Sequence, residues 1–259
     1  MKTIITTAGR PSVESIARAK LIATDLQVPF VERRKRSIAY LHREYNADVL
    51  VVSVEKLALY QMGITEPFFF HPNSAAYRLK RLLKGDSDPL IEAAQLQLGD
   101  SFLDCTLGLG SDSIIASYQV GKEGNVSGIE GNAQVAYIVK KGLQQFPTDH
   151  RTLKESMERI HVIHAEAINF LKTAETNSWD VVYMDPMFQQ PVNESINFSP
   201  LRQIGLQQRL SKEWMEEACR VAKRRIVVKD HYTSTIFKTY GMTQLTRPNI
   251  KFHFGYIDK

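Results

Sequence analysis

The chain has 259 residues, of which 43% are hydrophobic and 24% are charged, and its formal net charge is +5. This composition is ordinary for a globular protein and excludes disordered, collagen-like and coiled-coil chains as starting points. The cysteines Cys105 and Cys219 belong to no CxxC motif or Cys/His cluster, so we expect neither a disulfide framework nor a metal site. The sequence shows no apolar run of about 18 residues and no secretory signal, so we expect no membrane span and a cytoplasmic location. The positive charge favours a polyanionic partner.

Short apolar runs alternate with amphipathic stretches in the first 95 residues, which indicates α/β structure. We expect strands at 3–7 and 48–54, and helices at 12–26, 37–45, 75–84 and 90–98. We predict that residues 1–95 form a smaller α/β region, which contributes contacts to the substrate, and that residues 96–259 form the main domain.

The pattern becomes more regular after residue 100 and predicts a Rossmann-like α/β fold. Five strands are expected in a mainly parallel sheet, and a C-terminal antiparallel hairpin brings the sheet to seven strands. The expected strands are 101–106, 125–130, 160–164, 181–184 and 225–229, followed by the hairpin strands 243–246 and 251–257. The helices between them are expected at 112–119, 133–146, 166–173 and 212–221. Sheets of this kind bind ligands where their parallel strands end.

The first of these strands ends in an acid and a Gly-x-Gly turn. Asp104 precedes Gly108 and Gly110, and a helix is expected directly afterwards. Glycine permits a close approach of the backbone to a ligand, and a helix N-terminus offers unpaired N–H groups. The same pattern also fits a tight turn with no ligand.

Acidic residues also follow the second and third strands. Glu130 is placed to accept hydrogen bonds from ribose hydroxyls, although it also fits a solvated carboxylate at a helix start. Together with the glycine turn it indicates an adenosine-containing cofactor. Glu166 and Ala167 would lie beside the adenine, whereas His164 is expected to be a packed or capping residue.

The fourth strand delivers Asp185, Pro186, Met187 and Phe188 to the same edge. Proline cannot extend the strand ladder, so the chain must turn there. Carboxylate and carbonyl oxygens accept hydrogen bonds from an amino group, and an aromatic ring stacks on a flat base. The alternative is a plain Asp-Pro turn with Phe188 in the core.

These motifs together resemble a class I S-adenosylmethionine-dependent methyltransferase of the amino-group type. The segments DCTLGLGSDS, VVYMDPMF and RRIVVKDHY further resemble the bacterial small-subunit ribosomal RNA guanine-N2 methyltransferases. The resemblance covers about residues 71–259, whereas residues 1–70 do not match it well. It implies S-adenosylmethionine as cofactor and methyl transfer to an exocyclic amino group of an RNA base, guanine N2 of ribosomal RNA.

The resemblance also implies roles for individual residues. Ser111 and Asp112 would contact the cofactor, and Glu130 and Gly131 would hold its ribose. Asp185 would lie between the cofactor and the target amine. The chain departs from the family at Ser111, where arginine is more usual, at Glu166 and Ala167, which replace two small hydroxyl residues, and after Phe188, where a basic run is missing.

Two other functions remain open from the sequence. A nucleotide-dependent oxidoreductase would also use Gly108, Gly110 and Glu130, although Asp-Pro-Met-Phe would have no role in it. A non-catalytic RNA-binding assembly factor could retain a methyltransferase scaffold. Three basic clusters are candidate phosphate contacts, but each also fits a solvated face: Arg33–Arg36; Arg78, Lys80, Arg81 and Lys84; and Lys223–Arg225.

Overall fold

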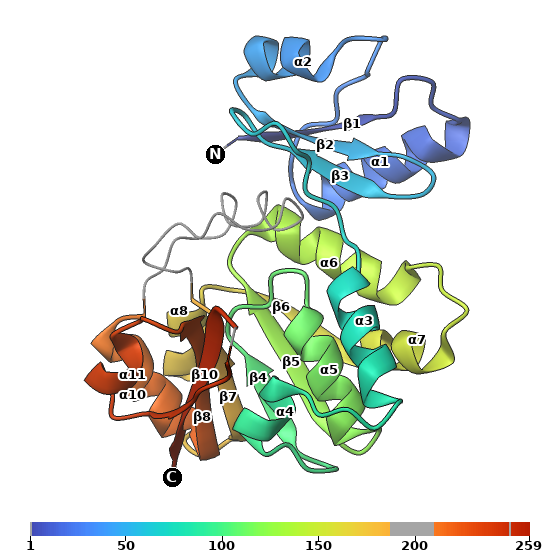
Figure 1. Ribbon diagram of the computed structural model, residues 1–259. Coiled ribbons are helices and arrows are strands. Elements are labelled where there is room, and N and C mark those ends of the chain that lie inside the picture. Colours follow the sequence, from blue (N-terminus) through green and yellow to red (C-terminus); the bar gives the residue numbers. More distant parts are fainter. Residues whose placement is uncertain (1, 187–209, 249) are drawn as a thin grey trace.

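The computed structural model describes residues 2–186, 210–248 and 250–259, and it contains two sheets (Figure 1). The larger sheet has seven strands in the order β6-β5-β4-β7-β8-β10-β9. The pairs among β6, β5, β4, β7 and β8 are parallel, and β10 pairs antiparallel with both β8 and β9. This arrangement confirms the Rossmann-like fold and the C-terminal hairpin. The strands are β4 (Ser101–Asp104), β5 (Asn125–Glu130), β6 (Ile160–His164), β7 (Trp179–Met184), β8 (Ala222–His231), β9 (Thr243–Leu245) and β10 (Phe252–Asp258).

Alternation along the strands divides the core into two apolar layers. Phe102 of β4 joins one buried cluster, and its neighbour Leu103 joins the other, because successive strand residues face opposite sides of a sheet. The first layer is covered by α3 (Asn73–Leu82), α4 (Pro89–Ala94), α5 (Ser111–Val120), α6 (Ala133–Gln145) and α7 (Arg151–Glu158). The second layer is covered by α8 (Ala167–Thr173), α10 (Lys212–Val221) and α11 (Ile236–Thr239).

The N-terminal part forms the smaller sheet, in the order β1-β2-β3. Its elements are β1 (Thr3–Thr7), α1 (Val13–Asp25), α2 (Ile38–Tyr45), β2 (Asp48–Val52) and β3 (Leu57–Tyr60). This part packs on α6: Phe70 occupies the space where Gly142 would carry a Cβ, at 2.1 Å from the nearest ring atom, and Tyr137 donates a hydrogen bond to Asp25 at 3.0 Å. One buried apolar cluster includes residues of both parts, from Ile5 of β1 to Leu143 of α6.

Most expected elements are present, and three observed ones were not expected. β3 follows β2 after only a short turn, in which Ser53 N–H donates to the Lys56 carbonyl at 3.1 Å, and the four residues of β3 are too short a run to show a strand pattern. α7 has eight residues and α11 has four, so each spans too few turns to be recognised from its pattern alone. Within the described residues, no helix is long and apolar enough to cross a membrane.

Candidate active site

Backbone hydrogen bonds bring the ends of four neighbouring strands together. Cys105 N–H donates to the carbonyl of Tyr183 at 2.9 Å and joins the end of β4 to β7. Leu107 N–H donates to Ile129 at 2.9 Å, and Ala165 N–H donates to Glu130 at 3.2 Å, which joins β4 to β5 and β5 to β6. Asp104, Glu130 and Asp185 therefore end neighbouring strands of the sheet, at the edge where the sequence predicts a ligand.

The Gly-x-Gly turn after β4 depends on left-handed backbone conformations and on close packing. Gly108 and Gly110 have φ values of 50° and 72°, which glycine adopts without strain. Leu107 packs against Gly128 of β5 so closely that a Cβ at residue 128 would lie 2.4 Å from the leucine side chain. The turn is thus held against the second strand, and α5 begins directly after it.

The Asp104 carboxylate stabilises the glycine turn through hydrogen bonds to residues on either side of it. One of its oxygens accepts from Thr106 N–H at 2.9 Å, and the other accepts from the Ser113 hydroxyl at 2.6 Å. Only 1% of the residue is exposed, and burial raises the pKa of its carboxyl to about 7. Both oxygens of Asp104, one of the predicted cofactor-binding residues, accept hydrogen bonds from within the protein. The side chain therefore stabilises the turn.

Glu130 lies between the glycine turn and the start of α6. Its carboxylate accepts from Asn132 N–H at 2.9 Å, and Asn132 in turn caps α6 by accepting from Gln134 and Val135. Burial raises the pKa of Glu130, while the backbone amides of Asn132, Gly108 and Gly131 oppose that rise. A buried carboxylate surrounded by N–H groups fits the predicted ribose position, since hydroxyl donors would stabilise its charge further.

The remaining predicted cofactor residues differ in exposure. Glu166 is exposed, precedes α8 and accepts from the Asn169 side chain at 3.0 Å, whereas Ala167 is buried beside the end of β6. Ser111 and Gly131 are half-buried at the starts of α5 and α6. All four lie at the same edge as the glycine turn.

Asp185 combines one occupied oxygen with one unpartnered oxygen. Its Oδ2 accepts from Lys229 Nζ at 2.7 Å, and its N–H donates to Thr106 Oγ1 at 2.7 Å. Its Oδ1 is buried and has no hydrogen-bond partner among the described residues. Pro186 follows and is buried. Phe188, the third predicted catalytic residue, lies outside the described residues.

A partly buried ionic cluster supports Asp185 from β8 and from the helices. Lys229 also donates to Asp112 at 3.1 Å, and Asp112 accepts from Tyr183 Oη at 2.8 Å and from Arg78 at 2.5 Å. Burial opposes the charge of Asp112, but Lys229 and Arg78 outweigh it and lower its pKa. Burial likewise opposes the Lys229 charge, but Asp112 and Asp185 raise its pKa. Burial raises the pKa of Asp185, and Lys229 limits that rise.

The structure corrects the expected role of several charged residues. Arg78 is no free phosphate contact, because its guanidinium pairs with Asp88 at 2.8 Å and with Asp112. The Asp112 side chain is turned into the ionic cluster. Two of the three cations of the cluster 223–225 are likewise engaged: Arg224 pairs with Asp100, and the buried Arg225 pairs with Asp258, whereas Lys223 is exposed and lies 3.5 Å from Asp180.

Sequence reasoning missed Lys229, Thr106 and Tyr183 as members of the site. Lys229 could have been found from the sequence, because it is a cation directly after the apolar run Ile226–Val228. Strands β7 and β8 are in register at Met184 and Val228, so Lys229 lies beside Asp185. Nothing in the sequence pairs Tyr183 with Asp112, 71 residues away.

Comparison with known proteins identifies the family. The family model described as "Putative SAM-dependent methyltransferase" matches residues 34–252. The chain belongs to this family. The Bacillus subtilis protein YpiP is 42% identical to the methyltransferase over 98% of both chains. A protein of Dechloromonas aromatica named ribosomal RNA small subunit methyltransferase J is 31% identical over 70% of this chain and 76% of its own. A solved S-adenosylmethionine-dependent methyltransferase from Neisseria gonorrhoeae shares the fold, with a TM-score of 0.60 and 16% sequence identity. The match covers 98% of this chain and 95% of that one.

The family establishes S-adenosylmethionine as the cofactor and methyl transfer as the reaction class, so hydride transfer is excluded. The residues present fit this cofactor. The glycine turn follows β4, Glu130 offers a buried carboxylate at the end of β5 on one side of it, and the unpartnered Asp185 Oδ1 offers an acceptor after β7 on the other side. When bound, S-adenosylmethionine supplies an electrophilic methyl group on a sulfonium.

Proposed function

We propose that the methyltransferase methylates an exocyclic amino group of a base in small-subunit ribosomal RNA. We propose that this group is N2 of a guanine. The observation that carries this proposal is the half-buried Asp185 at the end of β7, whose Oδ2 is held by Lys229 and whose Oδ1 is buried and has no partner in the described chain. A buried unpaired acceptor costs free energy unless a ligand supplies a donor. An amino group supplies that donor.

The chemistry requires that the amine nitrogen be oriented. Its lone pair is delocalised into the base, so the nitrogen is a poor nucleophile until its hydrogens are fixed. Asp185 Oδ1 and the Pro186 carbonyl would each accept one of those hydrogens and turn the lone pair toward the methyl group. The N–C bond forms as the S–C bond breaks, and the nitrogen then releases one proton. Fixing two reactants in line contributes up to about 7–11 kcal/mol to the barrier reduction.

The ionic cluster gives Asp185 the position that this role needs. The Asp185 N–H donates to Thr106 Oγ1 at 2.7 Å and Lys229 donates to Oδ2 at 2.7 Å, so the carboxylate is held in place while Oδ1 stays without a partner in the described chain. Lys229 also favours the ionised form of Asp185 against the effect of burial. Phe188 would stack on the base, as the sequence predicts.

Support for an RNA substrate comes from the relatives named ribosomal RNA small subunit methyltransferase J, at 31% and 30% identity. The positive net charge of +5 agrees with a polyanionic substrate. We propose further that residues 1–95 form a substrate-binding region beside the catalytic domain, and that the enzyme acts in the cytoplasm.

The test is methyl transfer to small-subunit ribosomal RNA and to whole small subunits from cells that lack the gene. Labelled S-adenosylmethionine reports incorporation, and mass spectrometry of digested RNA names the modified nucleoside and its site. We expect N2-methylguanosine at one site. Asp185→Asn should lower the rate at least about 100-fold, the scale of losing one preorganised electrostatic group, and should leave cofactor affinity within a few-fold.

The exposed Asp149→Asn is the control and should keep the rate of the wild-type enzyme. Full activity of Asp185→Asn would refute its role. Methylation of a different atom would refute the guanine-N2 assignment. Cofactor binding without methylation of any ribosomal RNA would favour an assembly factor instead.

A further inference from the structure

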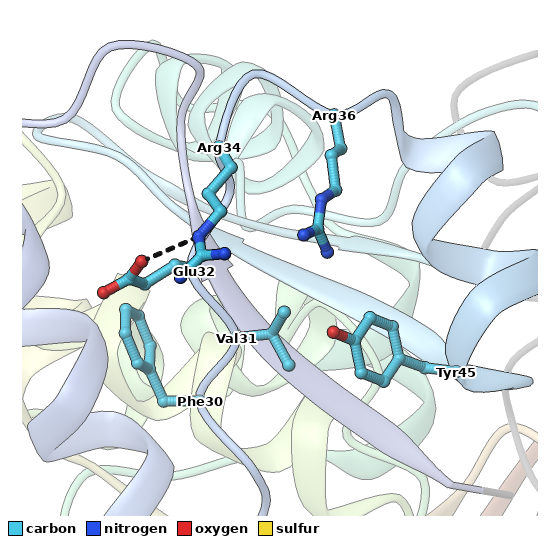
Figure 2. Close-up of a pocket in the computed structure, with 6 residues that line it drawn as sticks. All are labelled: Phe30, Val31, Glu32, Arg34, Arg36 and Tyr45. Carbon is cyan, nitrogen blue, oxygen red and sulfur yellow. Dashed lines mark hydrogen bonds and ion pairs between the residues drawn. The ribbon is translucent and has the colours of Figure 1, made fainter.

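Of the three basic clusters in the sequence, the one in the N-terminal part surrounds a surface hollow. Phe30, Val31, Glu32, Arg34, Arg36 and Tyr45 line a hollow of about 280 Å³. Figure 2 shows the guanidinium groups of Arg34 and Arg36 and the hydroxyl of Tyr45 directed toward the same space. The other clusters use Arg78, Arg224 and Arg225 in internal ion pairs, so they offer fewer free charges.

The local backbone holds this hollow in place. The segment before it is attached to β1, because Val31 N–H donates to Ile5 at 2.7 Å. The turn that follows is closed by Arg36 N–H to the Arg33 carbonyl at 2.9 Å, with left-handed φ values of 45° at Arg34 and 60° at Lys35. Two consecutive left-handed non-glycine residues are uncommon and costly. This turn places Arg34 and Arg36, two residues apart, on the same side.

The charges of the hollow are available to a ligand. Arg34 pairs with Glu32 at 3.1 Å, but both side chains are about two-thirds exposed, at 68% and 66%, and such surface pairs are weak. Arg36 has no carboxylate partner in the described chain, and its guanidinium lies 5.3 Å from the centre of the Tyr40 ring. Lys35 is exposed beside them. The hollow therefore presents net positive charge.

Exposed aromatic rings accompany these charges. Tyr45 and Tyr40 are 36% and 38% exposed, so part of each side chain is accessible to a ligand. Arginine beside exposed tyrosine is the combination that binds single-stranded RNA, since arginine binds phosphate and the ring stacks on an unpaired base.

We infer that this hollow is a second RNA subsite, which binds a phosphate through Arg34 and Arg36 and stacks an unpaired base on Tyr45. The inference rests on the proposed function for the identity of the substrate. The N-terminal part that carries the hollow packs on α6, the helix that begins just after Glu130. In Figure 1 this part lies beyond the edge of the large sheet where β7 ends. One RNA chain could thus contact both the hollow and the catalytic edge.

The test compares two variants that remove the same charge. Arg34→Gln with Arg36→Gln removes two positive charges from the hollow, and Arg151→Gln with Lys154→Gln removes two exposed, glutamate-paired charges from α7. Binding of a single-stranded fragment of small-subunit RNA is measured against salt concentration. Loss of the one phosphate contact that the two arginines share should reduce the slope of log K against log salt by about 0.7 for a single strand. The α7 variant should keep the slope of the wild-type enzyme.

Tyr45 tests the stacked base. Tyr45→Ala should weaken binding roughly 5- to 150-fold, the range for one lost stack, and Tyr45→Phe should restore it because stacking needs only the ring. In methyl-transfer assays the hollow variants should raise KM for RNA and leave kcat and cofactor affinity unchanged. Equal losses in the hollow and α7 variants would overturn the subsite.

The two proposals fail in different ways. If the hollow variants methylate RNA with the KM of the wild-type enzyme, the subsite is wrong and the proposed function stands. If no ribosomal RNA is methylated but Arg34→Gln with Arg36→Gln still loses RNA binding, the subsite is right and the proposed reaction is wrong.

Discussion

Lys229 offers the sharpest test of how the site is held together. Its ammonium lies 2.7 Å from Asp185 and 3.1 Å from Asp112. Lys229→Met keeps the approximate length of the side chain but removes the charge, and it leaves two partly buried carboxylates near each other. Removing one partner of a buried ion pair costs about 3–5 kcal/mol of unfolding free energy. We expect this loss in denaturant unfolding at neutral pH.

The pH dependence gives the direction of the effect. An opposite charge nearby lowers the pKa of a carboxyl by about 1–3 units, so removing Lys229 should raise the pKa of Asp185 and of Asp112. Asp112 has a lowered pKa and contributes stability that is present above its unfolded pKa. The cost of Lys229→Met should therefore be smallest in acid and grow as the pH rises. The acid limb of the methyl-transfer profile should move up by about 1–3 pH units.

Two further variants isolate this effect. Lys223→Met is the matched control, because Lys223 lies on the same strand, is 65% exposed and is 3.5 Å from Asp180. It should cost less than about 1 kcal/mol. Adding Asp112→Asn to Lys229→Met should recover part of the lost stability, since one of the two repelling charges is gone. If Lys229→Met unfolds like Lys223→Met and keeps the acid limb of the wild-type enzyme, the reasoning is refuted.

Two predictions concern the glycine turn. Gly128→Ala would place a Cβ 2.4 Å from Leu107, so we expect about 1–3 kcal/mol of destabilisation. Calorimetry should also show weaker cofactor binding. Gly9→Ala is the control and should change neither quantity, because a Cβ there has nothing within 4 Å in the described structure. Burial raises the pKa of Asp104 to about 7, so the folded state binds this proton more tightly than the unfolded state does. The free energy of unfolding should therefore fall as the pH rises from about 4 to 7. Asp104→Asn should flatten that slope in urea unfolding at several pH values, and an unchanged slope would contradict the assignment.

Much of the site follows from local sequence. The glycine turn, the acid after the second strand and Asp185-Pro186 each stand at a strand end that hydrophobic runs predict. Parallel strands place their carboxyl ends at one edge, so Asp104, Glu130 and Asp185 could be expected together before any coordinates were known. Sequence pattern also gave the Rossmann-like fold, since alternating strands and helices have few topological solutions.

Only the tertiary structure decided which carboxylates the basic residues pair with. Arg78 and Arg225 look like surface cations in the sequence, but Arg78 is partly buried and pairs with Asp88, and Arg225 is buried and pairs with Asp258. A charge pattern records which residues are basic and contains nothing about which carboxylate lies beside them, because those partners come from distant segments. The same is true of Lys229: strand register, set by pairing across the whole sheet, brings it against Asp185 and leaves one oxygen of that carboxylate without a partner in the described chain.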